Sequence, residues 1–320
     1  TTSCPMARLG LSALKSLLRR AGLRRSKRPA TWQPPTASWS RPLGQGWSSP
    51  YTVRYASNLD DGPNHGMPLG GFGAGCIGRA PDGSFNLWHL DGGEHWFGVL
   101  PDCQFSLFES NGNSSRAHAL AVEPSRDASR PEASKPLQSW DWYPASTETK
   151  QTGTYAARYP LSWSRYSGVF AAEVSCEAFS PILPGDYQRS SYPVAVFRWT
   201  LRNPSNPPLQ QSLLLSWRNT VGCLTNTDPS AEVHFRDDGS PEHNSAPAIG
   251  AGEGQSNRWV DQPGLKGVLL DGPRSQPLAE GEGQWCLALP DDLEDVEVMR
   301  CSRWDPTGDG AELWQSFAAE

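Results

Sequence analysis

The chain has 320 residues with 31 glycines and 29 prolines, which excludes a long all-helical fold because each such residue destabilises a helix interior by about 1 to 3 kcal/mol. Hydrophobic residues make up 37 % and include 14 tryptophans, so the chain can build a core and is not disordered along its whole length. The net charge is −6, but up to residue 59 the chain has ten Lys or Arg and no Asp or Glu. The rest of the chain holds 18 of the 28 basic residues and all 34 acidic residues, and this acidic remainder argues against a nucleic-acid partner.

Residues 1–30 form a basic tail that differs from the rest of the chain. Leu11, Leu14 and Leu18 recur at helical spacing among Lys and Arg, so the tail is interpreted as a disordered segment or as a short amphipathic helix at a membrane surface. Its apolar stretch is too short for a secretory signal or a bilayer span. We therefore expect a cytoplasmic protein without a signal peptide or transmembrane helix, with peripheral membrane contact through the tail as an alternative.

From residue 31 onward the sequence predicts short strands joined by Gly- and Pro-rich turns. Residues 171–179 alternate apolar and polar side chains, as in a half-buried antiparallel strand. Residues 193–203 are apolar on both faces, which predicts a central strand. The full set of predicted strands is 84–90, 104–110, 159–166, 171–179, 193–203, 211–220, 265–272, 284–290 and 296–304.

Three polar stretches interrupt this pattern, and no helical period of useful length follows residue 30. We expect these stretches to be connections, over residues 111–138, 144–153 and 222–263. Strands at this density predict an all-β fold. Residues 31–320 should form one large two-sheet antiparallel β-sandwich that follows the tail.

The run PLGGFGAGCIGR, residues 68–79, contains the spacing Gly-x-Gly-x-x-Gly at Gly73, Gly75 and Gly78. A dinucleotide site needs such a run between a strand and a helix, but Pro-Asp-Gly at residues 81–83 would end a helix at once. We therefore expect no nucleotide cofactor. The glycines are interpreted as positions of positive φ or of close backbone approach.

A second cluster, WHLDGGEHWF at residues 88–97, gathers imidazole and carboxylate groups between two tryptophans whose flat faces suit a sugar ring. These residue types can bind a metal ion, but without the fixed spacing of a helix no metal site is predicted. Candidates expected to face a substrate or a neighbouring domain are Trp88, His89, Asp91, Glu94, His95 and Trp96. Three other tryptophans lie in apolar runs and are expected in the core, namely Trp199, Trp217 and Trp285.

Hydrolase and metal motifs are missing from the sequence. The seven cysteines form no Cys-x-x-Cys pair, which excludes zinc-ribbon and thioredoxin-like sites and favours a reducing compartment. No Gly-x-Ser-x-Gly occurs. A glycosidase needs two carboxylates roughly 5 to 10 Å apart, and among 34 acidic residues spacing alone selects no such pair.

Several segments, in chain order, resemble the N-terminal domain of glycoside hydrolase family 116, which includes the non-lysosomal glucosylceramidase or bile-acid β-glucosidase. The resemblance covers roughly residues 36–305 and is nearest to cyanobacterial members. The segments that carry it are GMPLGGFGAGCIGR (66–79), SFNLWHLDGGEH (84–95), PDCQFSLFE (101–109), SWDWYP (139–144), FSPILPGDYQRSSYPVAVFRW (179–199) and LSWRNT (215–220).

This resemblance implies a β-sandwich that packs on a C-terminal (α/α)6 toroid and shapes its active site. It implies a retaining β-glycosidase whose Glu nucleophile and Asp acid/base both lie in the toroid. Because the sequence ends at SFAAE before a toroid begins, we expect no catalytic residue here and no activity from this domain alone.

The implied substrate is a β-glucoside or a glucosylceramide-like lipid, and the implied partner is the catalytic domain itself. The loop at residues 88–97 is our candidate for the part that reaches the interface between the domains. Two other hypotheses remain open. One is a stand-alone carbohydrate-binding β-sandwich without catalytic activity, and the other is a purely structural scaffold.

Overall fold

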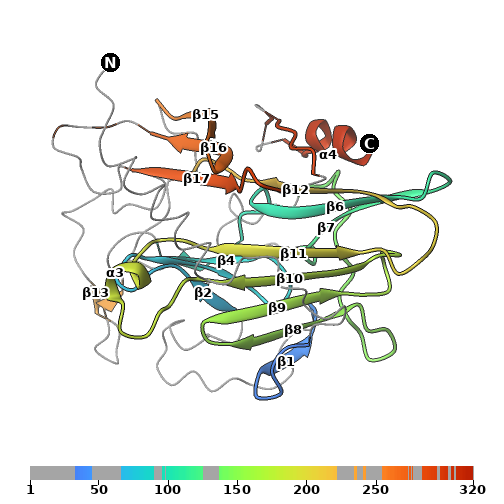
Figure 1. Cartoon of the computed structure of the whole chain (residues 1–320), viewed down its shortest axis with the longest axis horizontal. Helices are drawn as coiled ribbons and strands as arrows, with labels where there is room; N and C mark the ends of the chain where they lie inside the picture. The colour runs from blue at the N-terminus through green and yellow to red at the C-terminus, as the bar shows by residue number, and fades with distance from the viewer. Residues whose placement is uncertain are drawn as a thin grey trace.

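The computed structural model describes most of the chain from residue 66 onward and a short segment before it (Figure 1). The tail predicted over residues 1–30 lies outside the described residues. These are residues 33–44, 66–89, 96–97, 99–124, 137–221, 234–235, 241–242, 254–272, 274, 276, 283–293, 296–301, 304–305 and 308–319.

Five antiparallel strands form the largest sheet, in the order β1-β8-β9-β10-β11. In β10, Val174 and Ala178 are buried, as the alternation predicts. Glu177 on the opposite face is buried too, because it accepts hydrogen bonds from the Trp163 indole (3.2 Å) and from Arg198 (2.5 Å). The strands are β1 (Trp39–Pro42), β8 (Gly153–Arg158), β9 (Leu161–Tyr166), β10 (Glu173–Phe179) and β11 (Val196–Arg202).

The remaining described strands form four smaller sheets, and every ladder between named strands is antiparallel. The sheet orders are β12-β6-β7, β2-β3-β4-β5, β15-β16-β17 and β13-β14. The bounds are β2 (Met67–Leu69), β3 (Cys76–Arg79), β4 (Phe85–His89), β5 (Trp96–Phe97), β6 (Gln104–Ser110), β7 (Ser115–Ala119), β12 (Gln210–Ser216), β13 (His234–Phe235), β14 (Pro241–Glu242), β15 (Ser256–Gln262), β16 (Leu265–Asp271) and β17 (Gln284–Leu289).

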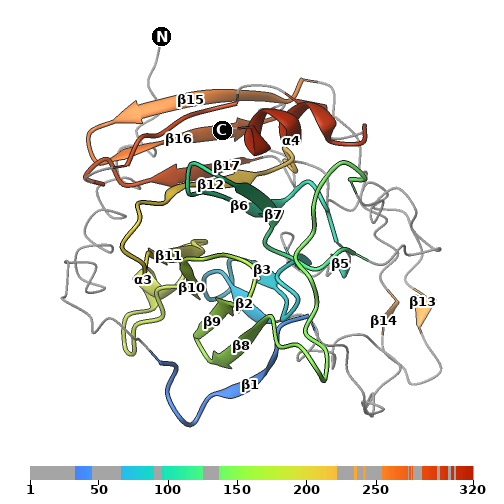
Figure 2. The same cartoon turned by 90° about the vertical axis from the view of Figure 1, so that its right-hand side faces the viewer.

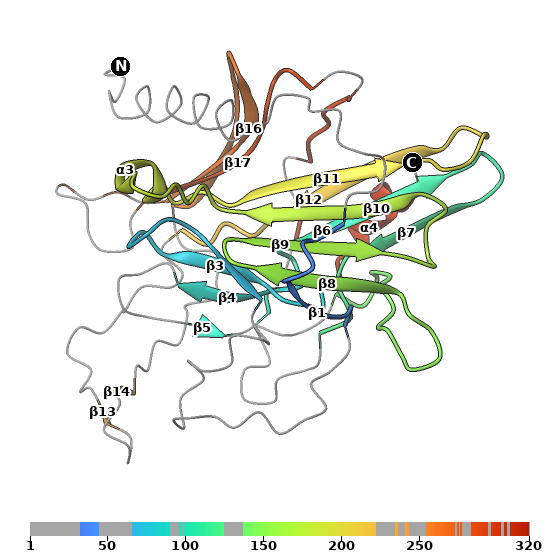
Figure 3. The ribbon, with the colours of Figure 1, turned by 60° about the horizontal axis from the view of Figure 1, so that its bottom comes forward.

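The sheets stack as layers around one apolar core. Figures 1 and 2 show β12-β6-β7 over the five-stranded sheet, with β15-β16-β17 above it, and Figure 3 shows β3 and β4 beside β8 and β9. Phe85 of β4 marks the centre, because its ring lies 6.0 Å from Phe105, 5.7 Å from Phe197 and 5.0 Å from Trp217. Residues far apart in the sequence therefore share one buried aromatic cluster.

Among the described residues, two short helices accompany the sheets, α3 (Tyr187–Ser190) and α4 (Ala311–Ala318). Helix α4 buries Leu313, Trp314 and Phe317 in a second apolar cluster on the outer face of β6 and β7. The Trp314 ring stacks on Trp140 with 5.2 Å between centroids. The indole N–H of Trp140 donates to the carbonyl of Gly310 (3.1 Å), which fixes the start of α4.

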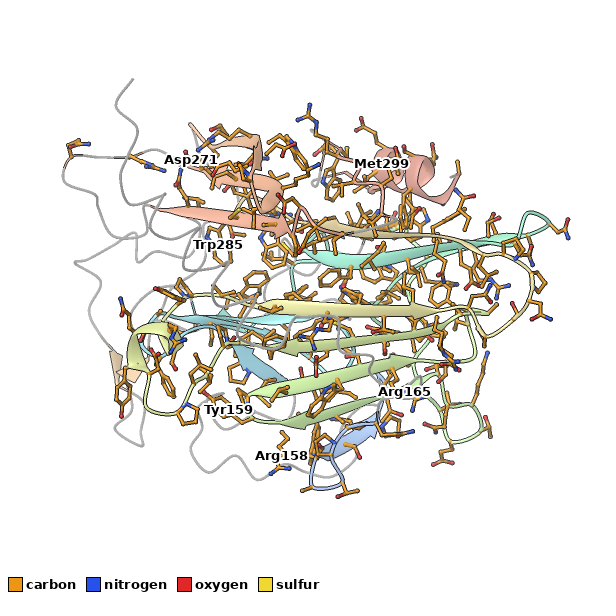
Figure 4. All side chains as sticks on the ribbon, viewed as in Figure 1. Arg158, Tyr159, Arg165, Asp271, Trp285 and Met299 are labelled. Atoms are coloured by element: carbon orange, nitrogen blue, oxygen red, sulfur yellow. The ribbon has the colours of Figure 1, made fainter. Side chains whose placement is uncertain are left out.

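The all-β sandwich prediction is confirmed, and eight of the nine predicted strands overlap observed ones, with 104–110 matching β6 at both ends. Trp217 is buried and Trp199 and Trp285 pack against the core, as expected. Figure 4 shows Trp285 pointing from β17 toward the layers below it. Apolar alternation was therefore a reliable guide to which segments form the sheets.

Some expectations were wrong. Residues 296–301 form no strand, and β11 ends its sheet rather than lying at the centre, because β12 continues in another layer. The predicted connections at 111–138 and 222–263 contain the strands β7 and β15. Helix α4 was not predicted because its apolar positions cover barely two turns.

No helix in the described part of the chain is both long enough and apolar enough to cross a membrane.

Candidate functional site

The predicted loop at residues 88–97 begins in β4 and ends in β5, where Trp88 pairs with Trp96 across the ladder. Trp88 is only 1 % exposed, and its ring lies 5.6 Å from Trp217 and 6.5 Å from Phe85. The surface role predicted for Trp88 is therefore wrong, because its side chain belongs to the core. Only the backbone of Trp96 is described, and three further candidates lie outside the described residues, namely Asp91, Glu94 and His95.

His89 ends β4 half-buried and pairs with Cys76 of β3 across the ladder. Burial raises the pKa of the Cys76 thiol, so this group stays protonated at neutral pH and is a poor nucleophile or metal ligand. No group of three or more His, Cys, Asp or Glu side chains is placed to hold a metal ion within the described ranges.

The glycine-rich run forms the turn between β2 and β3, where its glycines have the two roles that the sequence predicts. Gly73 and Gly75 have φ of 68° and 79°, a region that favours glycine. At Gly71 a Cβ would lie 2.4 Å from the backbone carbonyl of Ser191. The run leads into strand β3 rather than a helix, so the geometry of a dinucleotide site is missing here.

This glycine-rich turn is joined to the segment 180–191, which is more than a hundred residues later in the chain. The amide of Gly70 donates to the Ser180 hydroxyl (2.7 Å), and the amide of Phe72 donates to the Ser190 carbonyl (2.9 Å). Two segments that carry the sequence resemblance thus form one structural unit, which we call the aromatic rim because it exposes Phe72 by 52 % and Tyr187 by 80 %.

Helix α3 is fixed at its start by Asp186, whose carboxylate accepts from the amide of Arg189 (3.0 Å) and pairs with the Arg189 guanidinium. Ser190 then accepts from the amide of Leu183 (2.9 Å). Because these local bonds occupy the polar groups of the segment, Tyr187 is presented on a well-ordered turn. Sequence reasoning placed no functional residue on this rim.

Arg79, the last residue of the glycine-rich run, is a buried cation in the centre of the sandwich. Its Nη2 donates to the Tyr166 hydroxyl (2.6 Å) and to the Leu120 carbonyl (3.2 Å). The guanidinium also lies over the rings of Phe105 and Trp199, at 5.5 and 5.4 Å from their centroids. Arg79 therefore ties β3 to neighbouring layers and is not directed at a ligand.

The buried carboxylates of the described residues serve the fold. Glu109 accepts the amides of Ala171 (2.8 Å) and Ala172 (2.9 Å) through its two oxygens. Asp102 pairs with Arg218 at 2.6 Å, and burial raises the pKa of Asp102 while the guanidinium opposes that rise. Each buried carboxylate thus holds a structural partner, and no two of them are arranged around an open site.

A further surface was missed by the prediction of a strand at 296–304. Residues 289–299 expose four large aliphatic side chains and precede α4 in the chain. The signal was present in the sequence as the alternation Val-Glu-Val at residues 296–298, which predicts a pleated segment that needs a partner. Periodicity alone could not show that this partner is missing from the surrounding described residues.

Comparison with known families gives a match over most of the chain. The family description "beta-glucosidase 2, glycosyl-hydrolase family 116 N-term" fits residues 66–320, which include every strand from β2 onward, the aromatic rim and α4.

Proposed function

The chain belongs to glycosyl-hydrolase family 116, whose N-terminal domain its residues 66–320 match, and from this membership we propose that it is a non-catalytic β-sandwich that packs on and shapes the active site of a C-terminal (α/α)6 catalytic domain. The enzyme formed in this way hydrolyses a β-glucoside or a glucosylceramide-like lipid. The membership is the observation that carries this proposal.

The chemistry belongs to the catalytic domain. By resemblance to the family, an Asp there protonates the glycosidic oxygen while a Glu attacks the anomeric carbon, and water then hydrolyses the glycosyl-enzyme intermediate with retention. In support of this division of roles, the buried carboxylates of Asp102, Glu109 and Glu177 are each engaged by partners within the fold. The β-sandwich contributes orientation and cover.

The loop at residues 88–97 remains our candidate for the part of the sandwich that approaches the catalytic domain. His89 is half-buried at its start, and Asp91, Glu94, His95 and Trp96 would supply its polar and aromatic contacts. A cytoplasmic setting fits the thiols of Cys76, Cys176 and Cys286, which are free cysteines. Peripheral membrane contact would fall to the tail.

The experiment measures release of an aryl group from an aryl β-glucoside. The purified 320-residue chain alone should give no turnover above buffer. Its addition to a separately expressed family 116 catalytic domain should raise that domain's kcat/KM in a saturable way. The catalytic domain without the chain is the control. Enzymatic turnover by the chain alone, or addition without effect and without binding, would contradict the proposal.

The aromatic rim favours a second candidate function, a carbohydrate-binding β-sandwich that works without a catalytic partner. Phe72 and Tyr187 offer exposed apolar ring faces on a turn fixed by hydrogen bonds, which is how proteins present platforms to sugar rings. Titration with cellobiose, monitored by nuclear magnetic resonance, should then shift the signals of both rings. Tyr187→Ala should abolish binding, while Tyr159→Ala, another exposed tyrosine, should not.

A further inference from the structure

Several polar groups are buried on the outer face of the sheet β12-β6-β7, the face against which α4 packs (Figures 1 and 2). Ser106 of β6 lies opposite Ala119 of β7, and Ala119 forms a bridge to Trp142. Gln104 shares the face of Ser106, because side chains two residues apart on a strand point the same way. This is the face toward α4, since Ala119 and Phe108 belong to the apolar cluster around that helix. We call Gln104, Ser106 and Trp142 the polar row.

Each member of the polar row has a polar atom without a hydrogen-bond partner among the described residues. These atoms are the Nε2 of Gln104, the Oγ of Ser106 and the Nε1 of Trp142, and all three are buried. The side chains of Gln104 and Ser106 are 0 % exposed, so bulk solvent does not reach them. A buried polar atom without a hydrogen bond destabilises the fold, so three on one face of a sheet indicate that a further molecule binds there.

The surroundings of the polar row suit a small molecule. Sites for small molecules combine aromatic and apolar side chains with a few polar groups. The Trp142 ring lies 6.0 Å from the Trp140 ring, which in turn stacks on Trp314 of α4. Between Ser106 and Trp142 the sheet presents only the methyl group of Ala119. The polar row is therefore bordered by aromatic rings and has a small side chain at its middle.

The polar atoms define the chemistry of the ligand. The Oε1 of Gln104 accepts from the amide of Phe105 (2.9 Å), which leaves Nε2 as a donor. The Nε1 of Trp142 can only donate, whereas the Ser106 hydroxyl can both donate and accept. A hydroxyl group matches this set, because its oxygen accepts from the N–H donors while its proton is donated to the Ser106 oxygen.

We propose that the polar row is a binding site for neutral hydroxyl-bearing molecules, either ordered water or a small polyol. Its members carry no charge, and the ionic groups at the start of β6, Asp102 and Arg218, pair with each other at 2.6 Å, so an ion would find no counter-charge. The Cα atoms of Gln104 and Ser106 lie about 6.5 to 7 Å apart along the strand, which lets one hydroxyl oxygen bond to both side chains. The site lies within the sandwich and does not depend on the proposed function.

Replacement of Ser106 in the full 320-residue chain tests whether the site binds a ligand. Removal of a buried hydroxyl that has no partner should raise the melting temperature, because a desolvation penalty disappears. Removal of a hydroxyl that holds a ligand should instead lower it by about 2 to 4 °C, because a hydrogen bond is lost. We expect the lower melting temperature for Ser106→Ala. The matched control is Ser190→Ala, whose buried hydroxyl donates to the Leu183 carbonyl (3.1 Å) and which should also melt lower.

Nuclear magnetic resonance of the Gln104 side-chain amide protons distinguishes the two sources of the hydroxyl. Bound water should give a nuclear Overhauser effect to these protons that Ser106→Ala weakens and Ser190→Ala leaves unchanged. A bound polyol should appear in a titration with glycerol, as a saturable shift of the Gln104 signals that Ser106→Ala removes. The control variant should respond to glycerol as the unmodified chain does.

Either response supports the site and identifies its ligand as water or polyol. An unchanged or higher melting temperature for Ser106→Ala would overturn the proposal, because the hydroxyl would then have no ligand to lose. The proposal would also be wrong if the Gln104 protons responded neither to water nor to glycerol. A response that persisted at full strength in Ser106→Ala would place the ligand away from the polar row.

Discussion

Three tyrosines buried in the sandwich should make the protein sensitive to alkaline pH. Burial raises the pKa of Tyr143, Tyr155 and Tyr166, and for Tyr166 the Arg79 guanidinium opposes part of the rise. Two of these hydroxyls donate their protons within the fold: Tyr143 to the carbonyls of Thr152 (2.9 Å) and Ser167 (3.1 Å), and Tyr166 to the carbonyl of Leu120 (2.8 Å).

The sign of the effect follows from proton linkage. Above about pH 10 the unfolded chain loses phenolic protons that the folded chain keeps, so the free energy of unfolding falls as pH rises. A tyrosine that stays protonated in the folded chain contributes about 1.4 kcal/mol at pH 11, and all three tyrosines act in this direction. Burial also raises the pKa of Cys176 to about 12, which adds to the same loss. Against a typical total of about 5 to 15 kcal/mol, this loss is large.

Urea unfolding between pH 8 and pH 11, followed by tryptophan fluorescence, measures this dependence. Tyr143→Phe should lower the free energy of unfolding at pH 8 by about 1 to 2 kcal/mol, because two carbonyls lose their donor, but should reduce the further loss up to pH 11 by about 1.4 kcal/mol. Tyr187→Phe, at an exposed ring, is the control and should leave the slope unchanged. An unaltered slope in Tyr143→Phe would refute the reasoning.

Three further predictions concern the fold that supports the candidate surfaces. Gly71→Ala should lower the free energy of unfolding, measured by urea titration, by about 3 kcal/mol or more, since its Cβ would meet backbone at 2.4 Å. Gly73→Ala, with open space around the Cβ and a φ of 68°, should lower it by about 1 to 2 kcal/mol, and equal losses in the two variants would contradict this. Glu109→Gln should lower the melting temperature and reduce the free energy of unfolding by about 2 to 4 kcal/mol, because an amino group replaces one of the two oxygens that accept a backbone N–H. An unchanged melting temperature would show that these two hydrogen bonds do not stabilise the fold. Trp314→Ala should cost about 3 to 5 kcal/mol and increase amide exchange throughout α4, because its stacking on Trp140 is lost; slow exchange in the variant would argue against this anchor.

The glycines of the candidate site allowed its turns to be predicted from the sequence, whereas the tryptophans did not reveal which side chains are exposed. The spacing of the run at 68–79 and the proline after it indicated turns and close approaches, which Gly71 and Gly73 display, because these constraints act on a few neighbouring residues. Trp88 was assigned to the surface because polar residues follow it in sequence. Its burial depends on Trp217, which lies 129 positions away and which no local pattern connects to it.

By itself, the sequence determined the class of fold, most of its strands and its family, since alternation, turn residues and ordered motifs are local properties of the chain. Only the tertiary structure determined which strands lie at the edge of a sheet, which carboxylates pair with groups inside the fold, and which apolar side chains stay exposed to solvent. Residues 296–298 alternate apolar and polar side chains as β10 does, yet β10 is paired on both sides and 296–300 have no ladder partner in the part of the chain that the structure describes. The difference is physical: a strand becomes part of a sheet only when another backbone lies within hydrogen-bonding distance, and that distance is set by the packing of the whole domain.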